Sequence, residues 1–164
     1  MSMDIKIQVD EYRKWAPGSR LATRDGDYRS LLTAFSKRIA DLYVEELVKA
    51  INTQRYKSRW EPLTPEYLAY KKSQGLSTNI WEATSLLKDS ITVYRSGNSY
   101  VVGVNRSLRY PGTNVLVYKV IRWMEYGTSR MPARPLFMPV KRRIESNMRV
   151  YWESFLLERG VYNG

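Results

Sequence analysis

The sequence contains neither cysteine nor histidine in its 164 residues. These absences exclude disulfide bonds and the zinc sites that are built from those two residue types. They also exclude the Ser-His-Asp and Cys-His arrangements of nucleophilic catalysis, because both depend on a histidine base. An enzyme made from this sequence would have to work with carboxylates, lysine or tyrosine.

Motifs for phosphate, calcium and acid–base chemistry are missing as well. Neither GxxxxGK[ST] nor GxGxxG occurs. Asp25-Gly26-Asp27 lacks the spaced ligands and the closing glutamate of a calcium loop, so it predicts a turn and a helix cap. Glu45 and Glu46 are adjacent on a predicted helix and point in different directions, so they form no acid–base pair. We therefore predict a non-enzymatic protein with no catalytic site, no metal and no cofactor.

No apolar run approaches the roughly 20 residues that a membrane-spanning helix needs. The first ten residues, MSMDIKIQVD, lack the basic-then-apolar order of a signal peptide, so we expect neither membrane insertion nor export. With 43% hydrophobic and 26% charged residues, the chain has the balance of a globular protein. We predict one domain over residues 1–164, in which residues 1–27 form an N-terminal strand and loop or an arm.

Positive charge is what the sequence has in excess. The formal net charge is +11, with 27 Lys and Arg against 16 Asp and Glu. Residues 1–105 carry 16 basic and 12 acidic side chains, whereas residues 106–164 carry 11 and 4. Such an excess indicates nucleic acid, an anionic surface or an acidic protein as the partner.

The first half of the chain alternates strand and helix patterns. Residues 4–10 alternate apolar and polar side chains, which predicts a strand, and Pro17-Gly18-Ser19 then predicts a loop. Residues 28–54 place apolar side chains at steps of three and four, which predicts a long amphipathic helix. Thr64 and Pro65 are typical of the N-cap and first position of a short helix, which we expect to end near Gly75.

The second half begins with a predicted β-hairpin, in which residues 90–95 and 100–104 flank the turn Ser96-Gly97-Asn98. Residues 115–126 fit a strand or a helix, and we favour a helix ended by Gly127. A last helix is predicted from Pro139 to Arg159, and its apolar stripe is Val140, Ile144, Met148, Tyr151 and Phe155. The predicted fold class is α+β, a small antiparallel sheet packed with two long helices.

Aromatic residues are abundant, with 13 tyrosines and five tryptophans. Large aromatic side chains that carry a polar atom suit protein interfaces and also fill cores. Trp60, Trp81, Trp123 and Trp152 fit either environment, and the sequence leaves that choice open.

The basic residues Lys141, Arg142 and Arg143, with Arg149 two turns further on, lie on the exposed side of the predicted last helix. Charge of this kind neutralises phosphates without reading sequence, so one hypothesis is a small basic nucleic-acid-binding module. The other is a solvated face, or a face that docks on an acidic protein. No helix-turn-helix, zinc-finger or RNP signature supports sequence readout.

Two groups of motifs resemble phage proteins. Residues 125–137 contain Glu-Tyr-Gly-Thr and then, from residue 131, Met-Pro-Ala-Arg-Pro-Leu-Phe. This run resembles the motif of phage tail-completion proteins, among them the lambda-like minor tail protein Z, in which E-aromatic-G-T precedes P-A-R-P-F and a terminal helix. Upstream, Trp60-Glu61-Pro62-Leu63, Lys71 and residues 84–91 (TSLLKDSI) resemble Mu-type virion morphogenesis proteins, although Ser85 stands where their pattern has glycine.

The resemblance, which extends over about residues 30–160 in the expected order, implies a structural virion protein with a tail-completion-like fold. Such a protein assembles in the host cytoplasm and forms a ring, commonly of six copies, at the head–tail junction of the neck. The implied partners are further copies of the chain, the connector or adaptor, and the tail-tube or tail-terminator protein. Genome DNA in the ring's lumen is a further implied contact, without sequence specificity. The resemblance implies no membrane partner.

The motif also has a physical interpretation. Gly127 permits a backbone conformation closed to other residues, and two prolines stiffen the segment that follows. Arg134 offers a forked donor for a carboxylate or for carbonyl groups. One reading is an assembly surface and the other is a turn within the chain. The predicted interface residues are Glu125, Tyr126, Gly127, Thr128, Arg130, Pro132, Arg134, Pro135 and Phe137.

Overall fold

The structure is a computed structural model, and it describes residues 5–8 and 25–161. The predicted loop at Pro17-Gly18-Ser19, and the ends of the predicted strand at residues 4–10, lie outside these residues. The same holds for most of the predicted arm. The side chains of Asp25 and Asp27, which were predicted to cap the long helix, are also outside the description.

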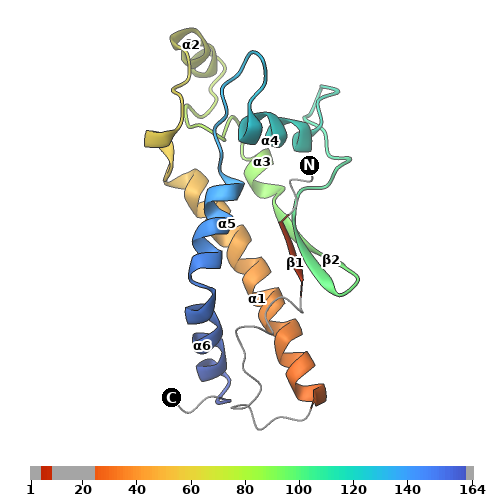
Figure 1. The fold of residues 1–164 in the computed structure, drawn as a ribbon. Helices are drawn as coiled ribbons and strands as arrows, with labels where there is room; N and C mark the ends of the chain where they lie inside the picture. The colour runs from red at the N-terminus through yellow and green to blue at the C-terminus, as the bar shows by residue number, and fades with distance from the viewer. Residues whose placement is uncertain (1–4, 9–24, 162–164) are drawn as a thin grey trace.

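A single long helix, α1 (Asp25–Asn52), forms the axis of the molecule (Figure 1). Its buried side chains recur at steps of three and four residues, as the sequence predicts, and they include Leu32, Phe35, Ile39, Tyr43 and Leu47. Each such side chain contributes roughly 1.5–3 kcal/mol when it leaves water, so packing holds this helix in place. The core of the protein is built around this face.

A three-stranded antiparallel sheet packs on one side of α1. The strands are β1 (Ile5–Gln8), β2 (Thr92–Ser96) and β3 (Ser99–Gly103), in the order β1-β3-β2. The predicted hairpin is confirmed: Ser96 pairs with Ser99 across a turn in which Gly97 has φ +58°. β3 is central, and Val102 in it is fully buried against α1.

The predicted single C-terminal helix is wrong, because two helices stand there: α5 (Phe137–Ser146) and α6 (Met148–Glu158). Asn147 separates them with φ −110° and ψ 11°. Its side-chain Nδ2 donates to the carbonyl oxygen of Arg143 at 2.8 Å, which is the kind of local bond by which asparagine competes with a helix ladder. Val140, Ile144, Met148 and Phe155 of the predicted stripe are buried, Trp152 and Leu156 are buried as well, and Tyr151 is half-buried.

Both C-terminal helices run beside α1 on the side away from the sheet (Figure 1). The ring centroid of Phe35 on α1 lies 4.8 Å from that of Trp152, in an edge-to-face contact, and 5.3 Å from that of Phe155. These contacts pack α6 against the N-terminal half of α1. The protein therefore has the α+β architecture that the sequence predicts, with a small antiparallel sheet and helices around one core.

The remaining short helices gather at the C-terminal end of α1 (Figure 1). They are the 3-10 helix η2 (Lys57–Arg59), α2 (Pro65–Ser73), α3 (Leu86–Asp89) and α4 (Val117–Tyr126). The predicted cap is confirmed, since the hydroxyl of Thr64 accepts from the backbone N–H of Tyr67. In the 115–126 run, residues 117–126 form the predicted helix, which ends at Gly127 as predicted, whereas Leu116 is extended. Within the described ranges, no helix has the length and apolar character that crossing a bilayer requires.

Candidate functional site

Two segments that are far apart in the sequence meet beside α4. One is residues 60–63, and the other is residues 127–136, which we call the connector. The indole Nε1 of Trp60 donates to the carbonyl oxygen of Pro135 at 2.8 Å. Arg134 reaches back with Nε to the carbonyl oxygen of Glu61 at 2.7 Å, and with a terminal nitrogen to that of Pro62 at 3.1 Å. The two groups of motifs found in the sequence thus form one structural unit.

A third segment, which carries Trp81, joins this unit. The indole Nε1 of Trp81 donates to the carbonyl oxygen of Arg134 at 2.8 Å, and the Trp81 ring lies 6.0 Å from that of Phe137. Burial is the main cause that lowers the pKa of the Arg134 guanidinium, and the charge of Glu61 offsets part of that effect. Because the carbonyl oxygens of Glu61, Pro62, Arg134 and Pro135 all accept hydrogen bonds, the connector is held by specific bonds as well as by its prolines.

Glu125 anchors the other end of the connector. Its buried carboxylate accepts hydrogen bonds from the backbone N–H groups of Leu136 at 2.7 Å, Phe137 at 2.9 Å and Met138 at 2.9 Å. These N–H groups open α5, where an α-helix has donors without partners of its own. A carboxylate at this point also interacts favourably with the helix dipole. Glu125 therefore fixes α4 and α5 to one another from inside the protein.

Gly127 is required where the connector begins. Its φ is +74°, and a Cβ placed there would lie 2.8 Å from the backbone nitrogen of Ala133 and 2.9 Å from the carbonyl oxygen of Met131. The connector folds back at this point, and the backbone N–H of Thr128 donates to the carbonyl oxygen of Met131 at 2.8 Å. Only a glycine meets both conditions, the positive φ and the close approach.

The nine predicted interface residues divide into two sets. Glu125, Arg134 and Phe137 are buried, and the first two bond to backbone groups of their own chain, so their side chains are not a docking surface. For Arg134 the turn within the chain is thus the reading that the structure favours. The other set, which is exposed or half-buried, consists of Tyr126, Gly127, Thr128, Arg130, Pro132 and Pro135. For this set, a role in assembly stays a prediction.

Three of the four residues of the predicted basic cluster lie near carboxylates. Nζ of Lys141 is 3.7 Å from Glu145, and Nε of Arg143 is 3.8 Å from Glu46. Arg149 bonds Glu153 at 2.8 Å, and it stands on α6 rather than on the same helix as the others. Arg142 is exposed on α5. The cluster is therefore less concentrated, and more neutralised, than the sequence predicts.

A cavity of 460 Å³ opens between α2, α4, the connector and the loop at residues 79–83; we call it the α2–α4 cavity. Its walls are mainly apolar and include Leu63, Ile80, Trp81, Val120, Trp123 and Met131. Tyr67 and Trp123, which line it, are 46% and 42% exposed, so they stand at its rim. Large aromatic side chains at a half-exposed rim are typical of protein-binding surfaces.

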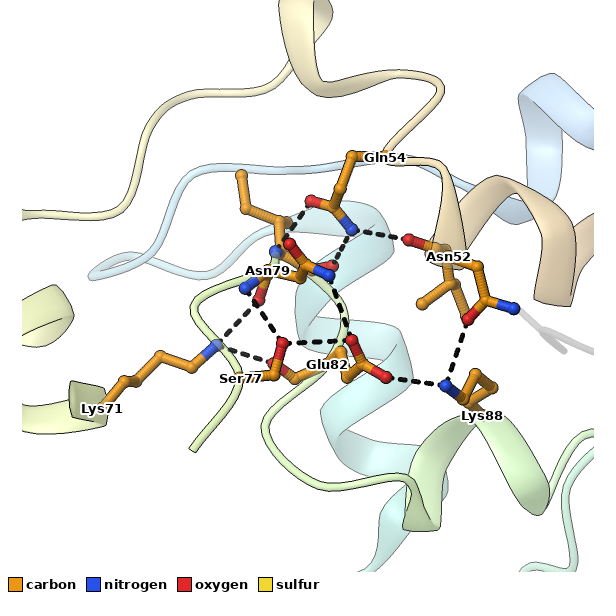
Figure 2. A network of polar contacts seen from close by, with 9 residues as sticks. Asn52, Gln54, Lys71, Ser77, Asn79, Glu82 and Lys88 are labelled. Atoms are coloured by element: carbon orange, nitrogen blue, oxygen red, sulfur yellow. Dashed lines mark hydrogen bonds and ion pairs between the residues drawn. The ribbon is translucent and has the colours of Figure 1, made fainter. Parts of the chain in front are cut away.

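Lys71 is the buried residue of α2, with 2% of its surface exposed, and it lines the α2–α4 cavity. Its ammonium donates to the carbonyl oxygens of Asn79 and Glu82, both at 2.7 Å, as Figure 2 shows. Burial lowers the pKa of Lys71 below its ordinary value, and the charge of Glu82 offsets part of that effect. The lysine thus holds the 79–82 loop against α2 at the edge of the cavity.

The Glu82 side chain is the centre of the same network (Figure 2). One carboxylate oxygen accepts from Lys88 at 2.7 Å, and the other accepts from Ser77 at 3.0 Å and Asn79 at 3.1 Å. The hydrogen bond from Lys88 is the largest cause that lowers the pKa of Glu82, although burial opposes it. Because its charge is met by these donors, Glu82 contributes little uncompensated negative charge to the cavity.

Two residues next to the cavity adopt left-handed backbone conformations: Gln54 at φ +49° and Trp81 at φ +68°. Such conformations cost a side-chain-bearing residue about 1 kcal/mol or more, and they persist where other contacts enforce them. The Gln54 amide supplies such contacts, since it accepts from the N–H of Ile80 at 2.9 Å and donates to its carbonyl oxygen at 2.9 Å. The loop that forms one cavity wall is therefore held in one conformation.

Sequence reasoning did not find the cavity, and it noted Lys71 only as part of a motif. A lysine on a short polar helix gives no local sign of burial, since the carbonyl groups that it bonds belong to Asn79 and Glu82 in a following loop. The sequence left open whether four of the tryptophans lie in the core or at the surface. Trp60, Trp81 and Trp152 are buried, whereas Trp123 is exposed at the rim of the α2–α4 cavity.

Neither chemistry nor similarity adds a catalytic assignment to this site. Residues 5–8 and 25–161 hold no group of three or more His, Cys, Asp or Glu side chains placed to bind a metal ion. Comparisons of the chain with protein-family models, with curated proteins and with solved structures each returned no match.

Proposed function

We propose that this chain is a structural, non-enzymatic virion protein of a tailed bacteriophage, which forms a ring at the head–tail junction. The ring completes the tail and joins it to the connector protein of the capsid, which is a separate protein and not the segment at residues 127–136. The observation that carries the proposal is the meeting of the two motif groups: Trp60 bonds Pro135, and Arg134 bonds both Glu61 and Pro62. Segments that resemble tail-completion proteins and Mu-type virion morphogenesis proteins therefore contact one another in this chain.

The exposed aromatic side chains around this unit support a role in protein assembly. Tyr67 and Tyr70 on α2 stack at 6.0 Å, and both are about half exposed. Trp123 and Tyr126 on α4 are exposed to a similar extent. Aromatic residues that face solvent together are characteristic of surfaces that a partner covers.

The ring requires a heterologous contact that closes by rotation. We expect the purified chain to form ring-shaped particles in electron micrographs, and a mass by light scattering that is a small multiple of 19.3 kDa. Tagged copies are expected at the neck of purified virions. A strictly monomeric chain that is absent from virions would contradict the proposal.

A nucleic-acid-binding module remains the second candidate, because the chain has a net charge of +11 and Arg142 is exposed on α5. The ion pairs of Lys141, Arg143 and Arg149 reduce the charge that this surface offers to phosphates. If DNA binding is the function, Arg142→Glu weakens binding and reduces its salt dependence. Unchanged binding in this variant assigns the charge to protein contacts.

A further inference from the structure

We propose that the α2–α4 cavity receives a side chain from a different, acidic protein: an aromatic or aliphatic group that fills the apolar walls, next to a carboxylate that accepts a hydrogen bond from Lys71. The inference rests on the proposed function only for the statement that this partner is another virion protein. The ligand chemistry itself follows from the lining of the cavity.

The size and walls of the cavity select an apolar group. Its volume of 460 Å³ falls within the range of ligand-binding pockets in proteins. Ile80, Trp81 and Val120 form the walls, while Trp123 and Tyr67 flank the opening. An aromatic ring or a branched aliphatic side chain in the cavity removes apolar surface from water on both partners.

The Lys71 ammonium selects an acceptor beside that apolar group. An ammonium has three N–H donors. Two of them are used by the carbonyl oxygens of Asn79 and Glu82, and the ammonium also lies 5.9 Å from the centroid of the Tyr67 ring, a weaker contact than a hydrogen bond to a carboxylate. Since Lys71 is 2% exposed and lines the cavity, the cavity is the path by which an acceptor from another molecule reaches the ammonium. Hydrogen bonds to ionised acceptors are stronger than neutral ones, so a carboxylate fits best.

Charge distribution points to an acidic partner rather than to a second copy. The cavity is lined by three cationic side chains, Lys71, Arg130 and Arg134, against the single carboxylate of Glu82. Lys88 binds that carboxylate at 2.7 Å from outside the cavity lining. A second copy would bring another net charge of +11 towards these cations, whereas an acidic protein is attracted to them.

The experiment uses N-acetylphenylalanine as the probe, because it combines an aromatic ring with a carboxylate, and N-acetylphenylalaninamide as its neutral counterpart. Both are titrated into the full-length chain and followed by amide resonances in NMR spectra. We expect the carboxylate to bind about tenfold more tightly than the amide, with saturable shifts confined to residues around the cavity. Comparable binding of both probes, or no saturable shift with either, overturns the inference.

Three variants locate the interaction. Lys71→Met is expected to remove the preference for the carboxylate, whereas Lys72→Met, on the exposed neighbour in α2, is expected to retain it. Ala83→Phe fills the cavity from its half-buried edge and is expected to abolish binding of both probes, which keeps the test valid if Lys71→Met is unstable. Retained carboxylate preference in Lys71→Met, or retained binding in Ala83→Phe with a native spectrum, contradicts the assignment.

The Ala83→Phe variant also tests which protein occupies the cavity. In a binding assay, the acidic protein that adjoins this subunit in the virion is expected to lose affinity for Ala83→Phe, while self-association of the chain is unchanged. If self-association is lost instead, the occupant of the cavity is a second copy and the inference is wrong. Probe binding requires no virion, so its failure is distinguishable from a failure of the proposed ring function.

Discussion

Nε of Arg134 donates a hydrogen bond to the carbonyl oxygen of Glu61 at 2.7 Å, although the two residues are 73 positions apart in the sequence. The contact joins the connector to the segment that precedes α2, and it places both beside the α2–α4 cavity. A surface arginine in an assembly motif would contact a neighbouring molecule. Here the buried arginine bonds backbone carbonyl groups of its own chain and so holds the connector in place.

Arg134→Lys is expected to destabilise the protein. Lysine is a point charge and cannot span the carbonyl oxygens of Glu61 and Pro62 with a planar fork. Loss of one charged hydrogen bond in a buried setting costs about 2 kcal/mol of the free energy of unfolding, measured by urea denaturation. Arg130→Lys, in the same connector but exposed, is the control, with a change within about 0.5 kcal/mol. Equal effects would contradict the assigned role.

Glu125→Gln is expected to be more damaging. Glutamine keeps one acceptor oxygen but turns an NH2 group towards the N–H donors of Leu136, Phe137 and Met138. We expect a loss of roughly 2–3 kcal/mol in unfolding free energy, because buried donors lose their acceptor and the helix loses its N-terminal carboxylate. Glu145→Gln, which is exposed on α5, should change little. A Glu125→Gln protein as stable as the wild type would refute this account.

Gly127→Ala and Gly160→Ala form a matched pair. Both glycines have positive φ, +74° and +66°, but a Cβ meets backbone atoms at 2.8 Å only at Gly127, whereas nothing lies within 4 Å of it at Gly160. Gly160→Ala is expected to cost about 1 kcal/mol through backbone strain alone. Gly127→Ala is expected to lower the melting temperature substantially more, because the connector has to move away. Calorimetry of the two variants checks the order.

Stability below neutral pH is expected to depend on Glu82. Its pKa is lowered in the folded protein from an ordinary value of 4.5, chiefly by the hydrogen bond from Lys88. The ionised carboxylate therefore contributes stability that is fully present above that ordinary value and is lost as the pH falls through the lowered pKa. The stability difference between wild type and Glu82→Gln should accordingly be large near pH 7 and shrink at about pH 2, by chemical denaturation.

The control for that experiment is Glu153→Gln, which removes an exposed carboxylate paired with Arg149 on α6. Its stability difference from wild type is expected to be small at both pH values, because exposed ion pairs contribute about 0–1 kcal/mol. A Glu82→Gln difference that stays constant between the two pH values would mean that the Glu82 charge contributes nothing to folding.

Most helices and strands were predictable from local pattern. The spacing of Leu32, Phe35 and Ile39 predicts the face of α1, and Gly97 predicts the hairpin turn. Thr64 and Pro65 mark the start of α2, and Gly127 marks the end of α4. These features depend on residues close in sequence, so the sequence contains them directly. The break at Asn147 was missed because periodicity continues through it, while one side-chain bond to Arg143 interrupts the helix.

The sequence by itself determined the α+β class, the absence of cysteine and histidine chemistry, the basic charge and the motif that begins at Glu125. Only the tertiary structure decided which of these residues face inwards: Glu125 and Arg134 hold the connector, and Lys71 lines a cavity. The physical reason is that burial depends on partners far away in the chain. Arg134 is buried by a segment 73 residues distant, and no local pattern reports that approach.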